Sequence, residues 1–233
     1  MPEPASIALV STGCAGLVLR FVQRQYRVAK AYVDWLAALA MLIVATPVMA
    51  VCMLLIRLTT KGPVIYKQER VGLHGRTFTI YKLRTMRVDA EAMTGPVWEC
   101  DKDPRVEPVG HVLRRTHLDE LPQLFNVLKG DMSLVGPRPE RPYFVNQLKQ
   151  QIPDYELRLK VKPGITGLAC IRNGGDRTIR DVRRKVKLDC LYIRRMCWWV
   201  DAVIIFKTVG SIFTAQTERR GLGSTKPSRA IGG

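Results

Sequence analysis

One stretch decides the architecture of this 233-residue chain: residues 35–56, WLAALAMLIVATPVMAVCMLLI, which carry no charged side chain. As a helix with a rise of 1.5 Å per residue, the stretch would extend about 33 Å, which is enough to cross the hydrocarbon layer of a bilayer. Thr46 and Pro47 lie near its middle. Because proline removes one backbone donor and clashes with the preceding turn, the sequence predicts a bend at this pair.

Basic residues flank the apolar stretch on both sides. They are Arg20, Arg24, Arg27 and Lys30 before it, and Arg57, Lys61, Lys67 and Arg70 after it. Lys and Arg concentrate in the cytoplasmic segments next to a membrane helix, so both flanks have a cytoplasmic signature. We therefore predict a re-entrant helix, broken at Thr46–Pro47, that enters and leaves the membrane by one face. The alternative is a plain spanning helix that tolerates the proline.

The remaining chain has the pattern of a mostly helical α+β protein. Residues 64–68 and 77–82 are rich in β-branched and aromatic side chains and predict a small β-hairpin around residues 72–75. Helical patterns cover 86–93, 118–129 and 140–161, and residues 179–214 have the pattern of one or two helices. Residues 109–115 are a short basic amphipathic piece, and tight loops are expected at 136–139 and 162–167. The predicted segments are a basic lead at 1–30, the membrane helix at 31–60, a globular domain at 61–215 and a flexible tail at 216–233.

The net charge of +17 points to polyanionic partners such as phosphorylated substrates, lipid headgroups or nucleic acid. Nine Lys or Arg residues lie between Arg172 and Arg195, directly before Trp198 and Trp199. Indole rings settle at headgroup depth, so the tryptophans favour amphipathic C-terminal helices at a membrane interface over a nucleic-acid stripe. A solvated basic face is the third interpretation.

Several classes of site are not expected. The six cysteines form no CxxC pair and only three histidines are present, which argues against structural zinc. The chain has no GxxxxGK[ST], GxSxG or HExxH motif, and no GxGxxG after a strand. P-loop, hydrolase, zinc-protease and dinucleotide-binding chemistry are therefore disfavoured.

The adjacent acids Asp119 and Glu120 are the strongest candidates for chemistry. Pro122 is comfortable only in the first turn of a helix, so the pair should lie at a helix start, where the dipole favours ionised carboxylates. Neighbouring acids point about 100° apart on a helix. They cannot flank a substrate symmetrically, but they can share a metal ion or divide the roles of nucleophile and metal ligand. The alternative is a helix cap followed by a first-turn acid.

Cations bracket the acidic pair along the sequence: Lys82, Arg84, Arg87, Arg114, Arg115, Arg138, Arg141 and Arg158. Pro137 and Pro139 restrain the backbone around Arg138. A guanidinium that binds phosphate oxygens with two parallel hydrogen bonds gains from such rigidity, although a surface-loop arginine is the plainer interpretation. A diphosphate substrate with Mg²⁺ would need counter-charges of this kind.

Five ordered motifs resemble the bacterial sugar transferases, the monotopic polyprenyl-phosphate phosphoglycosyl transferases. The motifs are residues 61–72 (KGPVIYKQERVG), 78–86 (FTIYKLRTM), 118–124 (LDELPQL), 129–140 (KGDMSLVGPRPE) and 161–167 (VKPGITG). The resemblance covers residues 30–215 and implies the minimal catalytic form, with 61–215 as a cytosolic catalytic domain. Thr46–Pro47 stands where the family has a Ser-Pro break, and the Thr46 hydroxyl should bond a carbonyl one turn back.

By this resemblance, Asp119 attacks the β-phosphate of a UDP-sugar, UMP leaves, and the sugar phosphate then passes from Asp119 to undecaprenyl phosphate. Mg²⁺ is the implied cofactor, with Asp119 and Glu120 as its ligands. The predicted phosphate-binding residues are Lys82, Arg84, Arg138 and Arg158. Asp189, Tyr192 and Asp201 also match the family pattern, whereas Cys197 stands where many members have serine.

The expected setting is the cytoplasmic leaflet of a bacterial inner membrane, with no nucleic-acid partner. Residues 94–98 and 103–105 resemble exopolysaccharide members, so glucose or galactose is the predicted sugar and an N-acetylhexosamine stays open. Whether the chain forms a homodimer is also open. The rival hypotheses are a non-catalytic membrane scaffold of an export complex and a membrane-tethered nucleic-acid binder.

Overall fold

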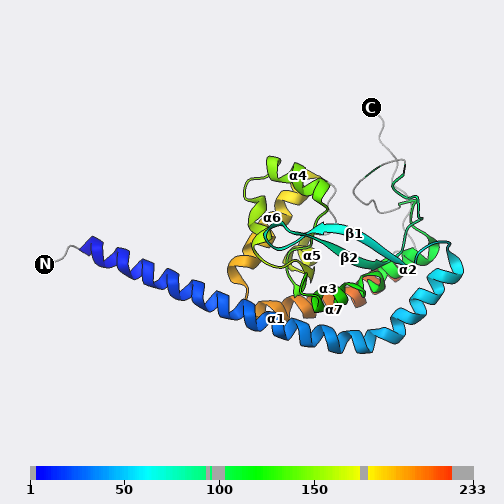
Figure 1. Cartoon of the computed structure of the whole chain (residues 1–233), viewed down its shortest axis with the longest axis horizontal. Coiled ribbons are helices and arrows are strands. Elements are labelled where there is room, and N and C mark those ends of the chain that lie inside the picture. Colours follow the sequence, from blue (N-terminus) through cyan, green and yellow to red (C-terminus); the bar gives the residue numbers. More distant parts are fainter. Residues whose placement is uncertain (1–3, 93–94, 96–102, 174–177, 222–233) are drawn as a thin grey trace.

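The computed structural model describes residues 4–92, 95, 103–173 and 178–221, and their side chains from residue 22 to residue 211. A long helix, α1 (Pro4–Thr59), underlies a globular part that sits on the concave side of its curve (Figure 1). Most of the loop at 94–98 and the tail from residue 222 onward lie outside the described residues.

Helix α1 runs through Pro47 without interruption, so the predicted break is wrong, but the predicted bend is present as a continuous curve (Figure 1). Thr46 Oγ1 donates to the Leu42 carbonyl over 2.7 Å, which confirms the expected hydroxyl bond. A proline removes only one backbone bond, so the helix can absorb the loss by curving. The helix also crosses the predicted boundary at residue 31 unbroken.

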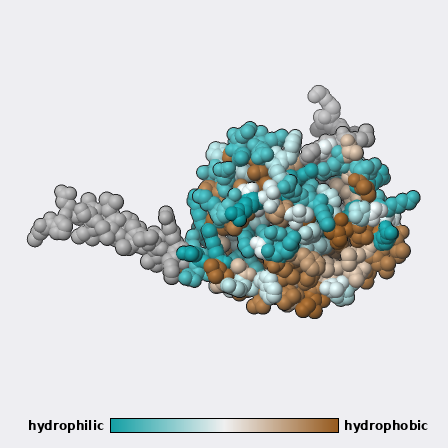
Figure 2. Space-filling view, viewed as in Figure 1, coloured by the Kyte–Doolittle hydropathy of each residue, from teal (hydrophilic) through white to brown (hydrophobic). Residues whose placement is uncertain are grey.

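The part of α1 from Val22 to Thr59 is long and apolar enough to cross a membrane, and only 17% of its most apolar window is buried against the rest of the chain. Figure 2 shows hydrophobic residues gathered along this edge of the molecule. The exposed side chains include Leu36, Ile43, Val44, Leu54 and Leu58 of α1, and Trp199, Phe206 and Val209 further along the chain. The core helix of a soluble protein would bury such a surface.

The predicted hairpin is confirmed. Strand β1 (Ile65–Val71) pairs antiparallel with β2 (Thr77–Leu83), and a short 3-10 turn, η1 (Leu73–Gly75), joins them. β-Branched and aromatic residues suit such a pleated ribbon. The hairpin carries Lys82 on its second strand, directly above the globular core.

A second pair of strands, β3 (Ser133–Val135) and β4 (Gly164–Thr166), is parallel. Strand β4 lies inside the predicted loop at 162–167, and β3 directly precedes the predicted loop at 136–139. The two backbones touch: a Cβ atom on Gly164 would lie 2.1 Å from the Gly136 nitrogen, and one on Gly167 would lie 2.2 Å from the Gly136 oxygen. Glycine is therefore required for the close approach. The contact locks the loop after β3 to the segment that leads into the next helix.

The helices of the globular part differ from the prediction in their bounds. They are α2 (Pro108–Arg115), η2 (Leu118–Glu120), α3 (Gln123–Leu128), α4 (Pro142–Gln151), η3 (Tyr155–Lys160), α5 (Leu168–Asn173), α6 (Ile179–Arg195) and α7 (Trp198–Gly221). Residues 88–92 form turns rather than a helix. The predicted helix at 140–161 is interrupted after Gln151, where Ile152 is extended, and the left-handed Asp154 then leads into η3. The single helix predicted at 118–129 is divided at Pro122.

Both limbs of α1 contribute to the core. Ala38 packs in one cluster with α3, the short parallel sheet and Ile204 of α7. Cys52 and Ile56 form another cluster with Leu83 of β2 and Leu113 of α2. The helix is thus held to the globular part at two separated places, and α7 lies alongside it (Figure 1).

We expect Gly164→Ala to lower the apparent melting temperature in detergent strongly, because the new methyl group would collide with backbone atoms that cannot move aside. The loss should be about 3 kcal/mol or more, enough to abolish soluble folded protein in a marginal domain. Gly210→Ala is the matched control. It lies in α7 with open space around it, so alanine should leave stability unchanged or raise it by less than about 1 kcal/mol. Equal losses in both variants would contradict the close-contact argument.

Candidate active site

The acidic pair lies in the 3-10 turn η2, between α2 and α3. His117, in a left-handed conformation, turns the chain into this segment, and Pro122 caps the following helix. The predicted position at a helix start is therefore approximate, because the acids lie in a separate 3-10 turn just before α3. Asp119 is buried, at 7% exposure, and Leu118 beside it packs against the Ile56 limb of α1.

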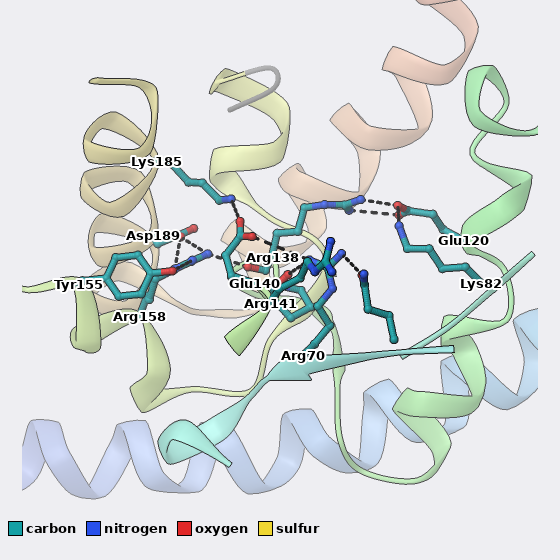
Figure 3. Close-up of polar contacts among 12 residues, drawn as sticks. Arg70, Lys82, Glu120, Arg138, Glu140, Arg141, Tyr155, Arg158, Lys185 and Asp189 are labelled. Carbon is teal, nitrogen blue, oxygen red and sulfur yellow. Dashed lines mark hydrogen bonds and ion pairs between the residues drawn. The ribbon is translucent and has the colours of Figure 1, made fainter. Parts of the chain in front are cut away.

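Glu120 is braced by two cations from different parts of the fold (Figure 3). Lys82 of β2 lies with its Nζ 2.9 Å from Glu120 Oε1. Arg138, in the loop after β3, donates through Nη1 to Oε2 over 3.2 Å and through Nη2 to Oε1. The paired guanidinium geometry is the strong form of a charge-assisted bond. One carboxylate thus ties together the hairpin, the acidic turn and the Pro137–Pro139 loop.

The two acids of the pair have opposite electrostatic environments. Burial raises the pKa of the Asp119 carboxyl, and Lys82 opposes this rise only in part. Burial would also raise the pKa of Glu120, but the charges of Arg138 and Lys82 outweigh it and hold that pKa well below its usual range. The helix-dipole expectation of two stabilised carboxylates is therefore wrong for Asp119, since α3 is short and desolvation dominates.

A cavity of about 1050 Å³ opens beside the pair. Its walls include five of the predicted site residues: Lys82, Arg84, Asp119, Glu120 and Arg138. Further cations on the wall, which the predicted site did not include, are Lys67, Arg70, Arg87, Arg105, Arg114, Arg141 and Lys185. Tyr66 and Phe144 add aromatic surface. A cavity of this size and charge suits a nucleoside diphosphate sugar.

Arg84 lies on the cavity wall, and only one of its two terminal guanidinium nitrogens is seen to donate a hydrogen bond among the described residues. Its Nη2 donates to Thr60 Oγ1 over 2.6 Å, at the point where α1 has just ended. Its Nη1 is buried and has no hydrogen-bond partner in the described part of the chain. Buried guanidinium donors are normally hydrogen-bonded, so this unpaired one is unusual.

Arg158 is not brought to the cavity wall. Its guanidinium is buried against Asp189, with Nη2 2.9 Å from Oδ2, and its Nη2 also donates to the Arg138 carbonyl over 2.7 Å (Figure 3). A third bond runs from Nη1 to the Tyr155 hydroxyl over 3.1 Å. These contacts hold the backbone of the Arg138 loop in place.

The same loop has a second support that sequence reasoning missed. Glu140 accepts from Lys185 and lies 3.8 Å from Arg70 Nη1, while Arg70 donates to the Pro139 carbonyl over 3.0 Å. Burial alone would raise the pKa of Glu140, but Lys185 and Arg158 lower it to about 2. Partners more than 40 residues apart leave no spacing signal, which is why the sequence did not reveal them.

The donor set is compatible with magnesium. No group of three or more His, Cys, Asp or Glu side chains that could hold a metal ion occurs among the described residues. Mg²⁺ does not need one, because it commonly takes one or two carboxylates and completes its octahedron with substrate phosphates and water. Asp119 and Glu120 supply two carboxylates on the wall of a cavity large enough for a diphosphate.

The opposite pKa shifts predict opposite effects on stability at neutral pH. The raised pKa of Asp119 means that its charge destabilises the native state, so Asp119→Asn should leave the apparent melting temperature unchanged or raise it by about 1–3 °C. The lowered pKa of Glu120 means that its charge contributes stability, which is present above the unfolded-state pKa and lost as pH falls. Glu120→Gln should therefore lower the melting temperature by about 4 °C or more. Differential scanning fluorimetry in detergent measures both, and shifts of the same sign would refute the assignment.

Comparison with known proteins places these residues in a family. The model of the bacterial sugar transferase family matches residues 25–215. The chain is 44% identical, over 81% of its length, to UDP-N-acetylgalactosamine-undecaprenyl-phosphate N-acetylgalactosaminephosphotransferase of Aeromonas hydrophila. It is 42% identical, over 78% of its length, to UDP-glucose:undecaprenyl-phosphate glucose-1-phosphate transferase of Escherichia coli.

A third relative, undecaprenyl-phosphate galactose phosphotransferase of Salmonella typhimurium, is 39% identical over 80% of the chain. The matched regions cover 44%, 40% and 40% of these three relatives, so the chain spans less than half of each. The matched region includes the acidic turn, the hairpin and the Pro137–Pro139 loop, together with α1 from residue 25. The chain belongs to the bacterial sugar transferase family.

Proposed function

We propose that this chain transfers a sugar 1-phosphate from a UDP-sugar to undecaprenyl phosphate through a phosphosugar intermediate on Asp119. One observation carries the proposal: a braced carboxylate, Glu120, stands next to an unbraced one, Asp119, on the wall of a large cationic cavity. The three relatives are all named as phosphotransferases or phosphate transferases that act with undecaprenyl phosphate.

Asp119 is the better nucleophile of the pair. Both oxygens of Glu120 accept hydrogen bonds from cations, which lowers their basicity. The Asp119 carboxylate makes no hydrogen bond or ion pair to any described side chain, and its raised pKa marks a more basic, partly desolvated oxygen. Glu120 is the fixed member that holds the turn in position.

The reaction then proceeds in two displacements at one phosphorus atom. An Asp119 oxygen forms a bond to the β-phosphorus, the bond from that phosphorus to the bridging oxygen breaks, and UMP leaves with the electron pair. An oxygen of undecaprenyl phosphate next attacks the same phosphorus, and the Asp119 carboxylate is released. Lys82, Arg84 and Arg138 are placed to balance the negative charge of the phosphates.

We assign magnesium to the acidic pair and to substrate phosphate oxygens. When bound, the ion would supply charge neutralisation at the diphosphate. Asp119 and Glu120 would be its protein ligands, and Lys82 and Arg138 hold Glu120 in a fixed orientation for that purpose. The remaining cations on the cavity wall draw both anionic substrates in.

We further propose that α1 is a re-entrant helix in the cytoplasmic leaflet of a bacterial inner membrane. Its exposed apolar side, its basic flanks and its curve support this arrangement, because the curve returns the Thr59 end toward the catalytic domain (Figure 1). Helices α6 and α7 would meet the membrane interface beside it. Exposed Trp198 and Trp199 of α7, after the exposed Arg194 and Arg195 of α6, suit headgroup depth.

Glucose or galactose remains the proposed sugar from the sequence, and the named relatives act on N-acetylgalactosamine, glucose or galactose. A non-catalytic scaffold would have no need for the intact brace on Glu120 or for the unpaired donor on Arg84. We therefore favour the enzyme.

Purified protein should release UMP when given the right UDP-sugar, undecaprenyl phosphate and Mg²⁺. Asp119→Asn should lower UMP release by about 10³-fold or more, because the nucleophile is gone while the folded site remains. Exposed Asp89, outside the cavity wall, is the control, and Asp89→Asn should behave as wild type. Intact-mass spectrometry should detect a sugar phosphate on Asp119. No UMP from any sugar of the panel, or unchanged release by Asp119→Asn, would refute the proposal.

The two flanks of α1 should be accessible from the same side of the membrane. In a cysteine-free background, Val28→Cys and Lys61→Cys introduce exposed thiols on either side of the apolar stretch. A membrane-impermeant maleimide should label neither in intact spheroplasts and both in inside-out vesicles. Labelling of one flank from the periplasm would instead support the plain spanning helix.

A further inference from the structure

We infer that a buried polar cluster between α1 and the catalytic domain is a positioning device for the lipid acceptor. The cluster, here called the α1 clasp, consists of Tyr26, Lys30 and Asp34 of α1, Ser133 of β3, Tyr192 of α6 and Asp201 of α7. The inference rests on the proposed function and assigns the clasp to its second step. In this proposal, the clasp sets the distance between the bilayer surface and Asp119.

The contacts of the clasp converge on Asp201. Its Oδ2 lies 2.6 Å from Lys30 Nζ and accepts a hydrogen bond from the Tyr26 hydroxyl, also over 2.6 Å. Its Oδ1 accepts from the Tyr192 hydroxyl over 2.8 Å. Lys30 Nζ also forms an ion pair with Asp34, one helical turn further along α1, at 3.2 Å from Oδ2. All three charged side chains are buried, which leaves little water to screen them.

The clasp is connected to the catalytic loop through two hydroxyl groups. Ser133 donates to Asp34, and its Oγ also lies 2.9 Å from the Val135 carbonyl. The Tyr192 hydroxyl lies 3.1 Å from the same carbonyl. Val135 ends β3, and three residues later Arg138 grips Glu120. The path from the membrane helix to the acidic pair is therefore short and built from directional contacts.

The position of the clasp along α1 is informative. Asp34 is immediately followed by the 22-residue uncharged stretch, so the clasp marks the point where the helix passes from protein to lipid. Unpaired charges at that depth would be costly, and here they are paired within the protein. The clasp thus defines how far α1 enters the membrane.

Directional contacts fix the position of α1 along its own axis, whereas apolar packing does not. The apolar clusters around Ala38 and Ile56 attract α1, but such contacts are non-directional and tolerate sliding. A shift of one helical turn would move the catalytic domain by about 5.4 Å along the helix. Misplacement of reacting groups by about 1 Å already lowers rates about 10²-fold. Ion pairs at one place along α1 remove this freedom.

Only one of the two substrates is sensitive to this distance. A UDP-sugar is water-soluble and reaches the cavity independently of the bilayer. The phosphate of undecaprenyl phosphate is held at the membrane surface by its tail, so the protein must bring Asp119 to that level. The clasp should therefore govern transfer to the lipid acceptor and leave formation of the phosphosugar intermediate unaffected.

The test separates the two half-reactions in bilayer nanodiscs. Tyr26→Phe removes one hydroxyl bond and keeps every charge, and Asp201→Asn removes the ion pair with Lys30. Tyr32→Phe is the matched control, since Tyr32 is on the same helix and 71% exposed. UMP released in a single turnover without acceptor reports the first step. Transfer from the intermediate is then measured with undecaprenyl phosphate and with a short, water-soluble isoprenyl phosphate.

We expect both clasp variants to give the wild-type UMP burst within about twofold and to transfer to undecaprenyl phosphate at least about tenfold more slowly. Transfer to the short acceptor should stay within about twofold of wild type, because its phosphate is not tied to the bilayer. Tyr32→Phe should match wild type throughout. Thermal melting identifies any variant that fails to fold. Tyr26→Phe removes only one hydroxyl group, so this variant should fold even if Asp201→Asn does not.

Two results would overturn the inference. If the UMP burst and both transfer rates fall together in Tyr26→Phe, the clasp is a general stabilising element. If none of them changes in either variant, the clasp has no part in the reaction. A wild-type protein that releases no UMP would instead refute the proposed function itself, and the positioning role with it.

Discussion

The site depends on the carboxylate of Glu120 and its two cations. A buried acid stays ionised only when partners compensate for lost water, and Lys82 and Arg138 together do this for Glu120. Because the three residues come from the hairpin, the acidic turn and the loop after β3, one interaction aligns three segments. It also separates the acids into a fixed member and a free one, and the free one, Asp119, faces the cavity.

The loop that carries Arg138 is itself held by buried charges. Arg158 binds its backbone, while Asp189 balances Arg158, and Lys185 and Arg70 hold the neighbouring Glu140 (Figure 3). Below it, the contact of Gly136 with Gly164 allows two backbones to pair without side chains between them. The arginine that meets Glu120 therefore stands on a rigid base, which suits a group that must be preorganised for charge stabilisation.

Helix α1 is packed against the same globular part that carries the acidic pair. Its Ala38 and Ile56 limbs enter two separate hydrophobic clusters, and the second of these also packs Leu118, the residue before the acidic pair. The clasp around Asp201 adds direction to these apolar contacts. Helix α1 is in this way held in register with the acidic turn by both apolar and directional contacts.

The sequence by itself determined the local features. It predicted the curved apolar helix and the hairpin and singled out the candidate pair Asp119–Glu120, because hydrophobic runs, prolines and β-branched clusters act through neighbours in the chain. Motif order also indicated the family that the comparison confirmed. Local rules were less reliable for helix ends, as Pro122 and Asp154 show.

Only the tertiary structure decided which charges meet. From the sequence, Arg138 and Arg158 were equivalent candidates for phosphate binding, yet one reaches Glu120 at the cavity and the other is buried against Asp189. The parallel pairing of β3 with β4 and the clasp at Asp201 were likewise invisible, since each joins residues tens of positions apart. Pairing between distant residues depends on how the whole chain packs, and burial then sets which carboxylate is charged, braced or free.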